Sequence, residues 1–229
     1  MKIETLQQFY DLMATTRDIR VKIVDAYFKN ITIDKDWITE LKNAQIALKN
    51  VTRLNGFYEL NLTRDKKIHI EMDYEINELE KDIFFLEHNP DEFISYLKTL
   101  HNNFGDQVDK LVNFLGQYNF KNFITDRDGT INNYCGRYIS SIQSVYNAVF
   151  LTKFGKDSVE NPVVLTSAPL ANIGLYDISV MPEGIFIYAG SKAREYFDRN
   201  GKRKQFPILD KKQQKLDILN EKLKRQIGR

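Results

Sequence analysis

The stretch FITDRDGT, residues 123–130, is a short apolar strand that ends in two aspartates and a glycine. Asp126 and Asp128 are separated by a single residue, so both would lie on the same face of a continued strand. A break at Gly129 lets them turn toward one point. Open α/β sheets bind their ligands at this carboxyl edge. Paired carboxylates are stable when a cation such as Mg²⁺ lies between them or when one is protonated. An ionised aspartate can attack phosphorus while a protonated neighbour supplies the leaving oxygen with a proton, so the segment predicts phosphoryl transfer.

This segment resembles the first motif of the haloacid-dehalogenase-like phosphatases, an apolar strand followed by Asp-x-Asp-Gly-Thr, and the match is complete. The resemblance implies that Asp126 is the nucleophile, that Asp128 is the general acid and base, and that both bind Mg²⁺, Asp128 through its backbone carbonyl. It places Gly129 and Thr130 in the phosphate-binding loop. A calcium loop of the EF-hand type would need glutamate at its twelfth position, where this chain has Arg137. An ordinary structural turn is the alternative that stays open.

A second apolar run, NPVVLTSAP at residues 161–169, ends in two hydroxyl side chains. Runs of this kind bounded by proline predict buried strands, and a hydroxyl at a strand end can bind a phosphate oxygen. The run is similar to the second motif of the same phosphatases. Alignment on Pro169 favours Thr166 as the phosphate ligand and leaves Ser167 as the second candidate. A helix cap is the structural alternative.

Between these strands the chain predicts a loop and then a helix. Residues 132–138 are rich in turn formers and include Arg137, whose guanidinium suits a phosphate or sugar, although an exposed arginine at a helix start fits equally well. Apolar residues then recur at helical spacing from 139 to a glycine stop at Gly155. A third strand is predicted over 184–190. Strand, helix and strand in this order predict a doubly wound α/β sheet.

Two further motifs of the phosphatases are missing from the sequence. Nothing like Gly-Asp-x-x-x-Asp follows Ile187, and Lys192 comes too early to be the lysine that neutralises the phosphate. The resemblance therefore implies an incomplete domain without its cap. The chain is interpreted either as the amino-terminal part of a longer enzyme or as a diverged relative that has lost catalysis.

The first half of the chain predicts a helical bundle. Apolar residues follow spacings of three and four over 3–30, 37–51 and 72–86, and Asn89-Pro90 begins a further helix with asparagine as its cap. A short helix over 108–115 precedes the strand that carries the aspartates. We expect a helical domain over 1–118, which docks a protein partner or self-associates, and the phosphatase-like domain over 119–229.

Composition excludes several functional classes. The 33 basic residues nearly balance the 31 acidic ones, which argues against nucleic-acid and membrane partners. The sequence has neither a long apolar segment nor a leader, and its single Cys135 cannot form an internal disulfide, so a cytoplasmic protein is expected. The three histidines, at 69, 88 and 101, lack metal-ligand spacing.

Residues 125–138 resemble the trehalose-6-phosphate phosphatases of the nematode type and the related glucosylglycerol-phosphate phosphatases, which also carry a helical region before the phosphatase core. The resemblance implies Mg²⁺-dependent hydrolysis of a sugar phosphate through an aspartyl-phosphate. Two alternatives stay open at this point. One is a non-catalytic protein that binds phosphate or a sugar phosphate, and the other is a helical interaction module.

Overall fold

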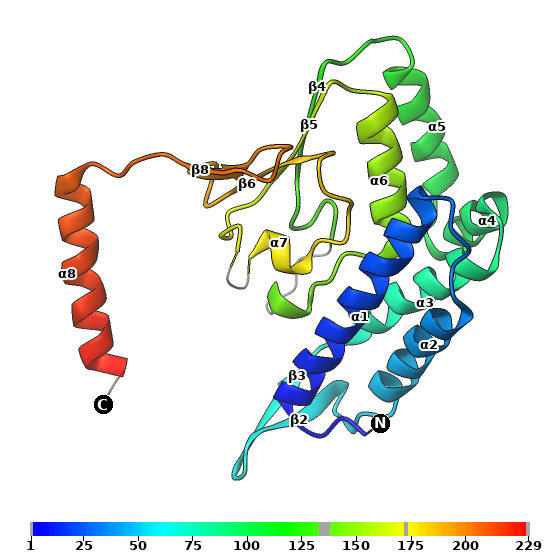
Figure 1. Cartoon of the computed structure of the whole chain (residues 1–229). Helices are drawn as coiled ribbons and strands as arrows, with labels where there is room; N and C mark the ends of the chain where they lie inside the picture. Colours follow the sequence, from blue (N-terminus) through cyan, green and yellow to red (C-terminus); the bar gives the residue numbers. More distant parts are fainter. Residues whose placement is uncertain (1, 133–137, 172–173, 228–229) are drawn as a thin grey trace.

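The computed structural model describes residues 2–132, 138–171 and 174–227, and it shows a helical half packed against an α/β half (Figure 1). The helical half is built from α1 to α5. Its long helix α1 lies beside α6 of the α/β half. The helices span Leu6–Phe28 (α1), Lys35–Lys49 (α2), Asp73–Glu87 (α3), Pro90–Leu100 (α4) and Phe104–Leu115 (α5). The predicted sequence of a helical bundle followed by an α/β domain is confirmed.

The predicted start of α4 is confirmed by its capping geometry. The Asn89 side chain accepts from the Glu92 N–H at 3.0 Å, and the Glu92 carboxylate accepts from the Asn89 N–H at 3.1 Å. Pro90 occupies the first turn, where its missing N–H costs nothing. Phe93 of this helix is fully buried and contacts Phe150 of α6 at 6.3 Å between ring centroids. The cap therefore fixes a helix that helps to join the two halves.

A small antiparallel sheet between α2 and α3 was not predicted. Its strands are β1 (Arg53–Leu54), β2 (Phe57–Thr63) and β3 (Lys66–Ile70). Asn55 and Gly56 link the first two strands, and both have positive φ, 51° and 88°. An Asn-Gly pair between extended segments is typical of a two-residue hairpin turn, because both positions need that backbone conformation. The signal was present in the sequence, but the helical periodicity on either side dominated the prediction.

The α/β half contains one mixed sheet among the described residues. Its strand order is β4-β5-β6-β7-β8. Strands β4, β5 and β6 pair in parallel, whereas β7 pairs antiparallel with both β6 and β8. Helix α6 links β4 to β5, and the single turn α7 precedes β6. The elements span Asn122–Asp126 (β4), Tyr138–Ser140 (a 3₁₀ turn, η1), Val145–Asp157 (α6), Asn161–Leu165 (β5), Leu175–Ile178 (α7), Ile187–Gly190 (β6), Glu195–Phe197 (β7), Arg203–Gln205 (β8) and Asp210–Ile227 (α8).

The two faces of this sheet differ. Thr125 of β4 and Val164 of β5 are neighbours in register and are buried, whereas Ile124 on the opposite face of β4 is 66% exposed. Helix α8 stands apart from the sheet at the end of an extended segment (Figure 1). Helix α6 packs on the covered face, where the ring centroids of Phe123 and Phe154 are 5.0 Å apart, and the exposed Ile124 marks an open second face of the aspartate strand.

Several boundaries differ from the prediction, among them the start of α5, which is Phe104 and not residue 108. Helix α6 begins at Val145 rather than at residue 139, and it continues past Gly155 to Asp157. A Cβ atom on Gly155 would lie 2.8 Å from the Phe186 ring, so this glycine allows close packing of α6 on the chain before β6 and does not end the helix. The third strand begins at Ile187, later than the predicted residue 184. None of the described helices combines the length and apolar character needed to cross a membrane.

Candidate active site

The first predicted aspartate lies at the carboxyl edge of the parallel strands. Asp126 is the last residue of β4, is opposite Leu165 of β5 in register, and has an exposed side chain. The Arg127 N–H donates to the Leu165 carbonyl at 3.0 Å, which extends the pairing by one step. Thr166 follows Leu165 directly, so the two predicted motifs meet at adjacent strand ends. This is the edge at which open α/β sheets bind ligands.

The second aspartate is held from two sides. The Thr166 hydroxyl donates to one oxygen of Asp128 at 3.0 Å, and the Arg127 guanidinium donates to the other at 2.5 Å. The Asp128 side chain is 19% exposed, and Thr166 is buried. The Thr166 oxygen also accepts from the Ala168 N–H at 3.2 Å. These contacts favour Thr166 over the exposed Ser167 as the hydroxyl of the second motif.

The loop after the motif is a tight turn. The Arg127 carbonyl accepts from the N–H groups of Ile131 and Asn132, both at 3.0 Å, and from that of Thr130 at 3.4 Å. Gly129 has a φ of 87° and donates to the Asn132 carbonyl at 2.6 Å. That backbone conformation explains the glycine. Thr130 is exposed and takes part in the turn through its backbone.

Arg127 is the residue whose role the sequence did not predict. It is 3% exposed, and its guanidinium donates to the Ser141 carbonyl and, at 3.0 Å, to the Ser141 hydroxyl. The guanidinium also lies 4.7 Å from the centroid of the Tyr138 ring, and burial raises the pKa of Tyr138 to about 12. The alternation of faces along a strand could have indicated its burial, because residue 127 faces the opposite side from residues 126 and 128. Arg137, which the sequence did predict as a phosphate or sugar contact, lies outside the described residues, as does Cys135.

Lys192 lies near the same edge. The residue follows β6, and its backbone N–H donates to the Thr166 carbonyl at 3.2 Å. Ser191 and Lys192 have φ of 51° and 57°, and the Ser191 N–H donates to the Ala168 carbonyl at 2.6 Å. From the sequence, this lysine comes too early to be the family's phosphate-neutralising lysine, but the fold brings its backbone next to the predicted phosphate ligand Thr166. A side chain with a positive charge therefore starts beside Thr166.

The described residues provide part of a metal site. Asp126 offers exposed carboxylate oxygens, and Mg²⁺ commonly binds through one or two carboxylates together with water and substrate phosphates. Within the described ranges, no group of three His, Cys, Asp or Glu side chains is arranged to hold a metal. Both carboxylate oxygens of Asp128 accept hydrogen bonds, from Thr166 and from Arg127, so the groups that would hold Mg²⁺ are the exposed Asp126 carboxylate and, as the resemblance implies, the Asp128 backbone carbonyl, with water and phosphate completing the shell.

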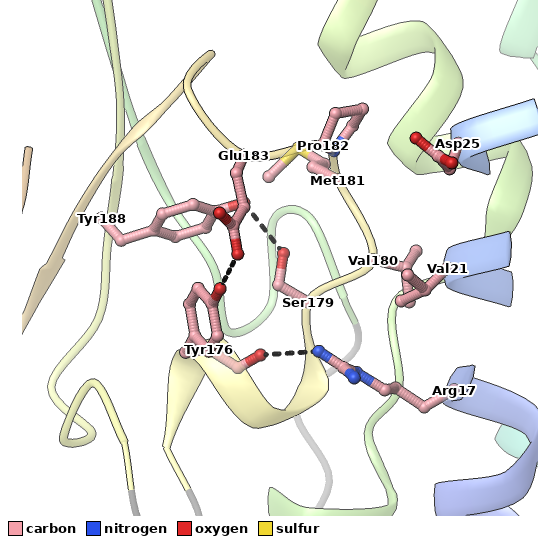
Figure 2. A pocket seen from close by; sticks show the side chains of 10 residues that line it. All are labelled: Arg17, Val21, Asp25, Tyr176, Ser179, Val180, Met181, Pro182, Glu183 and Tyr188. Atoms are coloured by element: carbon pink, nitrogen blue, oxygen red, sulfur yellow. Dashed lines mark hydrogen bonds between the residues drawn. The ribbon is translucent and has the colours of Figure 1, made fainter. Parts of the chain in front are cut away.

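A separate cavity lies between the two halves (Figure 2). It has a volume of about 390 Å³ and lies between α1 and the chain from α7 to β6. Arg17 of α1 reaches across to donate to the Tyr176 carbonyl at 3.3 Å, and the Ser179 and Tyr188 hydroxyls are 3.0 Å apart. None of the residues that line this cavity is among the predicted site residues.

A helical bundle, a mixed sheet and two aspartates at the end of its first strand define the class of protein, an α/β protein with an aspartate motif at the carboxyl edge of its parallel strands. Residues 5–113 match the trehalose-6-phosphate phosphatase N-terminal helical bundle domain. Residues 123–229 match the C-terminal domain of the same proteins. The chain belongs to the trehalose-6-phosphate phosphatase family.

Curated relatives from nematodes align with most of this chain. A protein named alpha,alpha-trehalose-phosphate synthase [UDP-forming] 2, from Caenorhabditis elegans, is 33% identical over 234 residues, which is 95% of this chain and 19% of that protein. A protein named trehalose-phosphatase, from Brugia malayi, is 28% identical over 254 residues, which is 97% of this chain and 51% of that protein. The chain therefore spans about a fifth of the first relative and about half of the second.

Proposed function

We propose that this chain carries the nucleophile and the general acid of a Mg²⁺-dependent sugar-phosphate phosphatase that acts on trehalose 6-phosphate. The observation that carries the proposal is the contact between the Asp128 carboxylate and the Thr166 hydroxyl, 3.0 Å apart, beside Asp126 at the sheet edge. Family membership supports the substrate. The single cysteine of the sequence suits the cytoplasm, and we propose the division between the two domains near residue 118.

The proposed reaction has two steps. An oxygen of Asp126 attacks phosphorus, the bond from phosphorus to the sugar oxygen breaks, and that oxygen takes a proton from Asp128. Water then attacks the phosphorus of the aspartyl-phosphate and gives its proton to Asp128. The bond between phosphorus and the Asp126 oxygen breaks, so phosphate leaves and the Asp126 carboxylate is restored. Bound Mg²⁺ would neutralise charge on the transferring phosphoryl group. The Thr166 hydroxyl and Lys192 are proposed to contact phosphate oxygens.

The test is phosphate release from trehalose 6-phosphate in the presence of Mg²⁺. We expect Asp126→Asn to reduce release to background while the far-UV circular dichroism spectrum and melting temperature stay unchanged. Asp109→Asn, the same chemical change at an exposed position of α5, is the matched control and should release phosphate at the wild-type rate. Equal release by Asp126→Asn and wild type would refute the assignment.

The same proteins distinguish the phosphatase from the alternative of a non-catalytic protein that binds a sugar phosphate. It gains from the finding that the described residues hold only part of a metal site. This alternative predicts that trehalose 6-phosphate raises the melting temperature of the wild type while no phosphate is released. Absence of both effects would refute both functions.

A further inference from the structure

Helix α3 directs three acidic side chains toward the α/β half. Glu75, Glu78 and Asp82 lie on one face of the helix and are 2%, 6% and 0% exposed. Carboxylates are rarely buried so completely unless they are paired. The Glu75 carboxylate accepts from the Ser140 hydroxyl at 2.8 Å, and that of Glu78 accepts from the Tyr146 hydroxyl at 2.9 Å. Glu75 and Glu78 therefore both contact the segment over 140–146.

Asp82 caps helix α6 from outside its own segment. One oxygen of Asp82 accepts from the Val145 N–H at 2.7 Å and from the Tyr146 N–H at 3.3 Å. Ser144 occupies the N-cap position, but its side chain makes no capping hydrogen bond. The first N–H groups of a helix need an acceptor, and a negative charge there is favoured by the helix dipole. Arg20 of α1 neutralises the carboxylate at 2.7 Å.

The other side of the same segment touches the candidate active site. Arg127 donates to the carbonyl and the hydroxyl of Ser141, and the Asn132 side chain donates to the Ile142 carbonyl at 3.1 Å. Arg127 holds Asp128 at 2.5 Å, and Asn132 closes the turn after the motif. The segment over 140–146 thus connects α3 of the helical half to the aspartate loop.

We infer that helix α3 positions Asp128 for its role in phosphoryl transfer, through the segment over 140–146 and through Arg127. Asp82 and Arg127 are positioning residues in this inference. The role of Asp128 rests on the proposed function, whereas the mechanical coupling does not. A general acid must lie within hydrogen-bond reach of the leaving oxygen, and small misplacements of such groups are costly. The helical half then contributes to catalysis without touching the substrate.

The coupling is tested with two variants that differ only in the cap. Arg20→Met/Asp82→Asn removes the buried charges and keeps an oxygen that accepts from the α6 N–H groups. Arg20→Met/Asp82→Ala removes the charges and the acceptor. Amide hydrogen exchange is measured for 129–132, whose N–H groups at 129, 131 and 132 bond within the aspartate loop. We expect exchange there to be about fivefold faster in the alanine variant than in the asparagine variant, the scale of a lost helix cap.

Faster exchange confined to the first turn of α6, with 129–132 unchanged, would overturn the inference. Tyr27→Phe is the matched control, because it removes the hydrogen bond from Lys153 to Tyr27 at the other end of α6, and it should leave 129–132 unchanged. Global unfolding is monitored at α2 amides. If the alanine variant unfolds globally, Ser140→Ala is compared with wild type instead. This variant removes the hydrogen bond from Ser140 to Glu75, and the same increase in exchange rate is expected at 129–132.

Phosphate release separates this inference from the proposed function. We expect the alanine variant to lose about tenfold in kcat with KM unchanged, because a displaced general acid affects the transition state and not substrate binding. Equal kcat in the two cap variants would overturn the positioning role. If wild type releases no phosphate, the proposed function fails, while the exchange result still decides whether α3 is coupled to the Asp128 loop.

Discussion

Replacing Asp82 with asparagine removes one charge from a pair that the fold buries almost completely. The Arg20 and Asp82 side chains are 1% and 0% exposed, and 2.7 Å separates Nε of Arg20 from the carboxylate. Asp82→Asn leaves a guanidinium that cannot lose its proton in a protein. Removal of one partner from a buried pair costs roughly 3–5 kcal/mol, which corresponds to roughly 6–20 °C in melting temperature at this chain length.

Arg20→Met has a smaller expected cost for a chemical reason. The remaining Asp82 carboxyl can take up a proton, and it keeps two backbone N–H donors. We expect a loss of roughly 1–2 kcal/mol for this variant, less than for Asp82→Asn. The double variant, which buries no charge, should recover to within about 1 kcal/mol of wild type.

Urea unfolding near neutral pH, followed by far-UV circular dichroism, measures all four proteins of this cycle. The slope with urea should be the same in each, so that midpoints report stability. A cost of Arg20→Met that equals or exceeds that of Asp82→Asn would refute the argument from proton uptake. Additive single effects, with no recovery in the double variant, would refute the buried pair itself.

Three further predictions use the same fold. Burial raises the pKa of Asp82 from its ordinary 3.8 to about 6, so between pH 6 and pH 4 the folded state binds a proton that the unfolded state releases. The free energy of unfolding of wild type, relative to that of Arg20→Met/Asp82→Asn, should therefore rise as pH falls from 6 to 4. A difference in free energy that does not change with pH would contradict this. Gly155→Ala should cost roughly 1–3 kcal/mol in urea unfolding, because its Cβ would lie 2.8 Å from Phe186. Gly129→Ala, with open space around it, should cost about 1 kcal/mol from its positive φ alone. An unchanged stability of Gly155→Ala would argue against the close packing. Thr166→Val should lower kcat for phosphate release about tenfold and should cost about 1 kcal/mol of stability, because the buried hydroxyl also accepts from the Ala168 N–H, and an unchanged kcat would remove Thr166 from the site.

The sequence by itself determined the features that are local. The helical stripes, the Asn89 cap and the strand before Asp126 follow from periodicity and from residue types within a few positions of each other. The hairpin at Asn55 and Gly56 was local too, and its turn chemistry could have revealed it. The sequence also indicated that both motifs end a strand, and parallel strands bring their carboxyl ends to one edge, but it did not predict the hydrogen bond between Thr166 and Asp128.

Only the tertiary structure decided the contacts between the two halves. Asp82 and the N–H groups of α6 that it caps are 63 and 64 positions apart in the sequence, and no periodicity reports an acceptor supplied from another helix. No role for Arg127 was predicted from the sequence, and only the fold shows that it is buried against Ser141. The backbone of Lys192 meets that of Thr166 only because β6 ends beside β5 in the folded sheet. The physical reason is that a buried charge is fixed by partners that packing brings to it from distant segments.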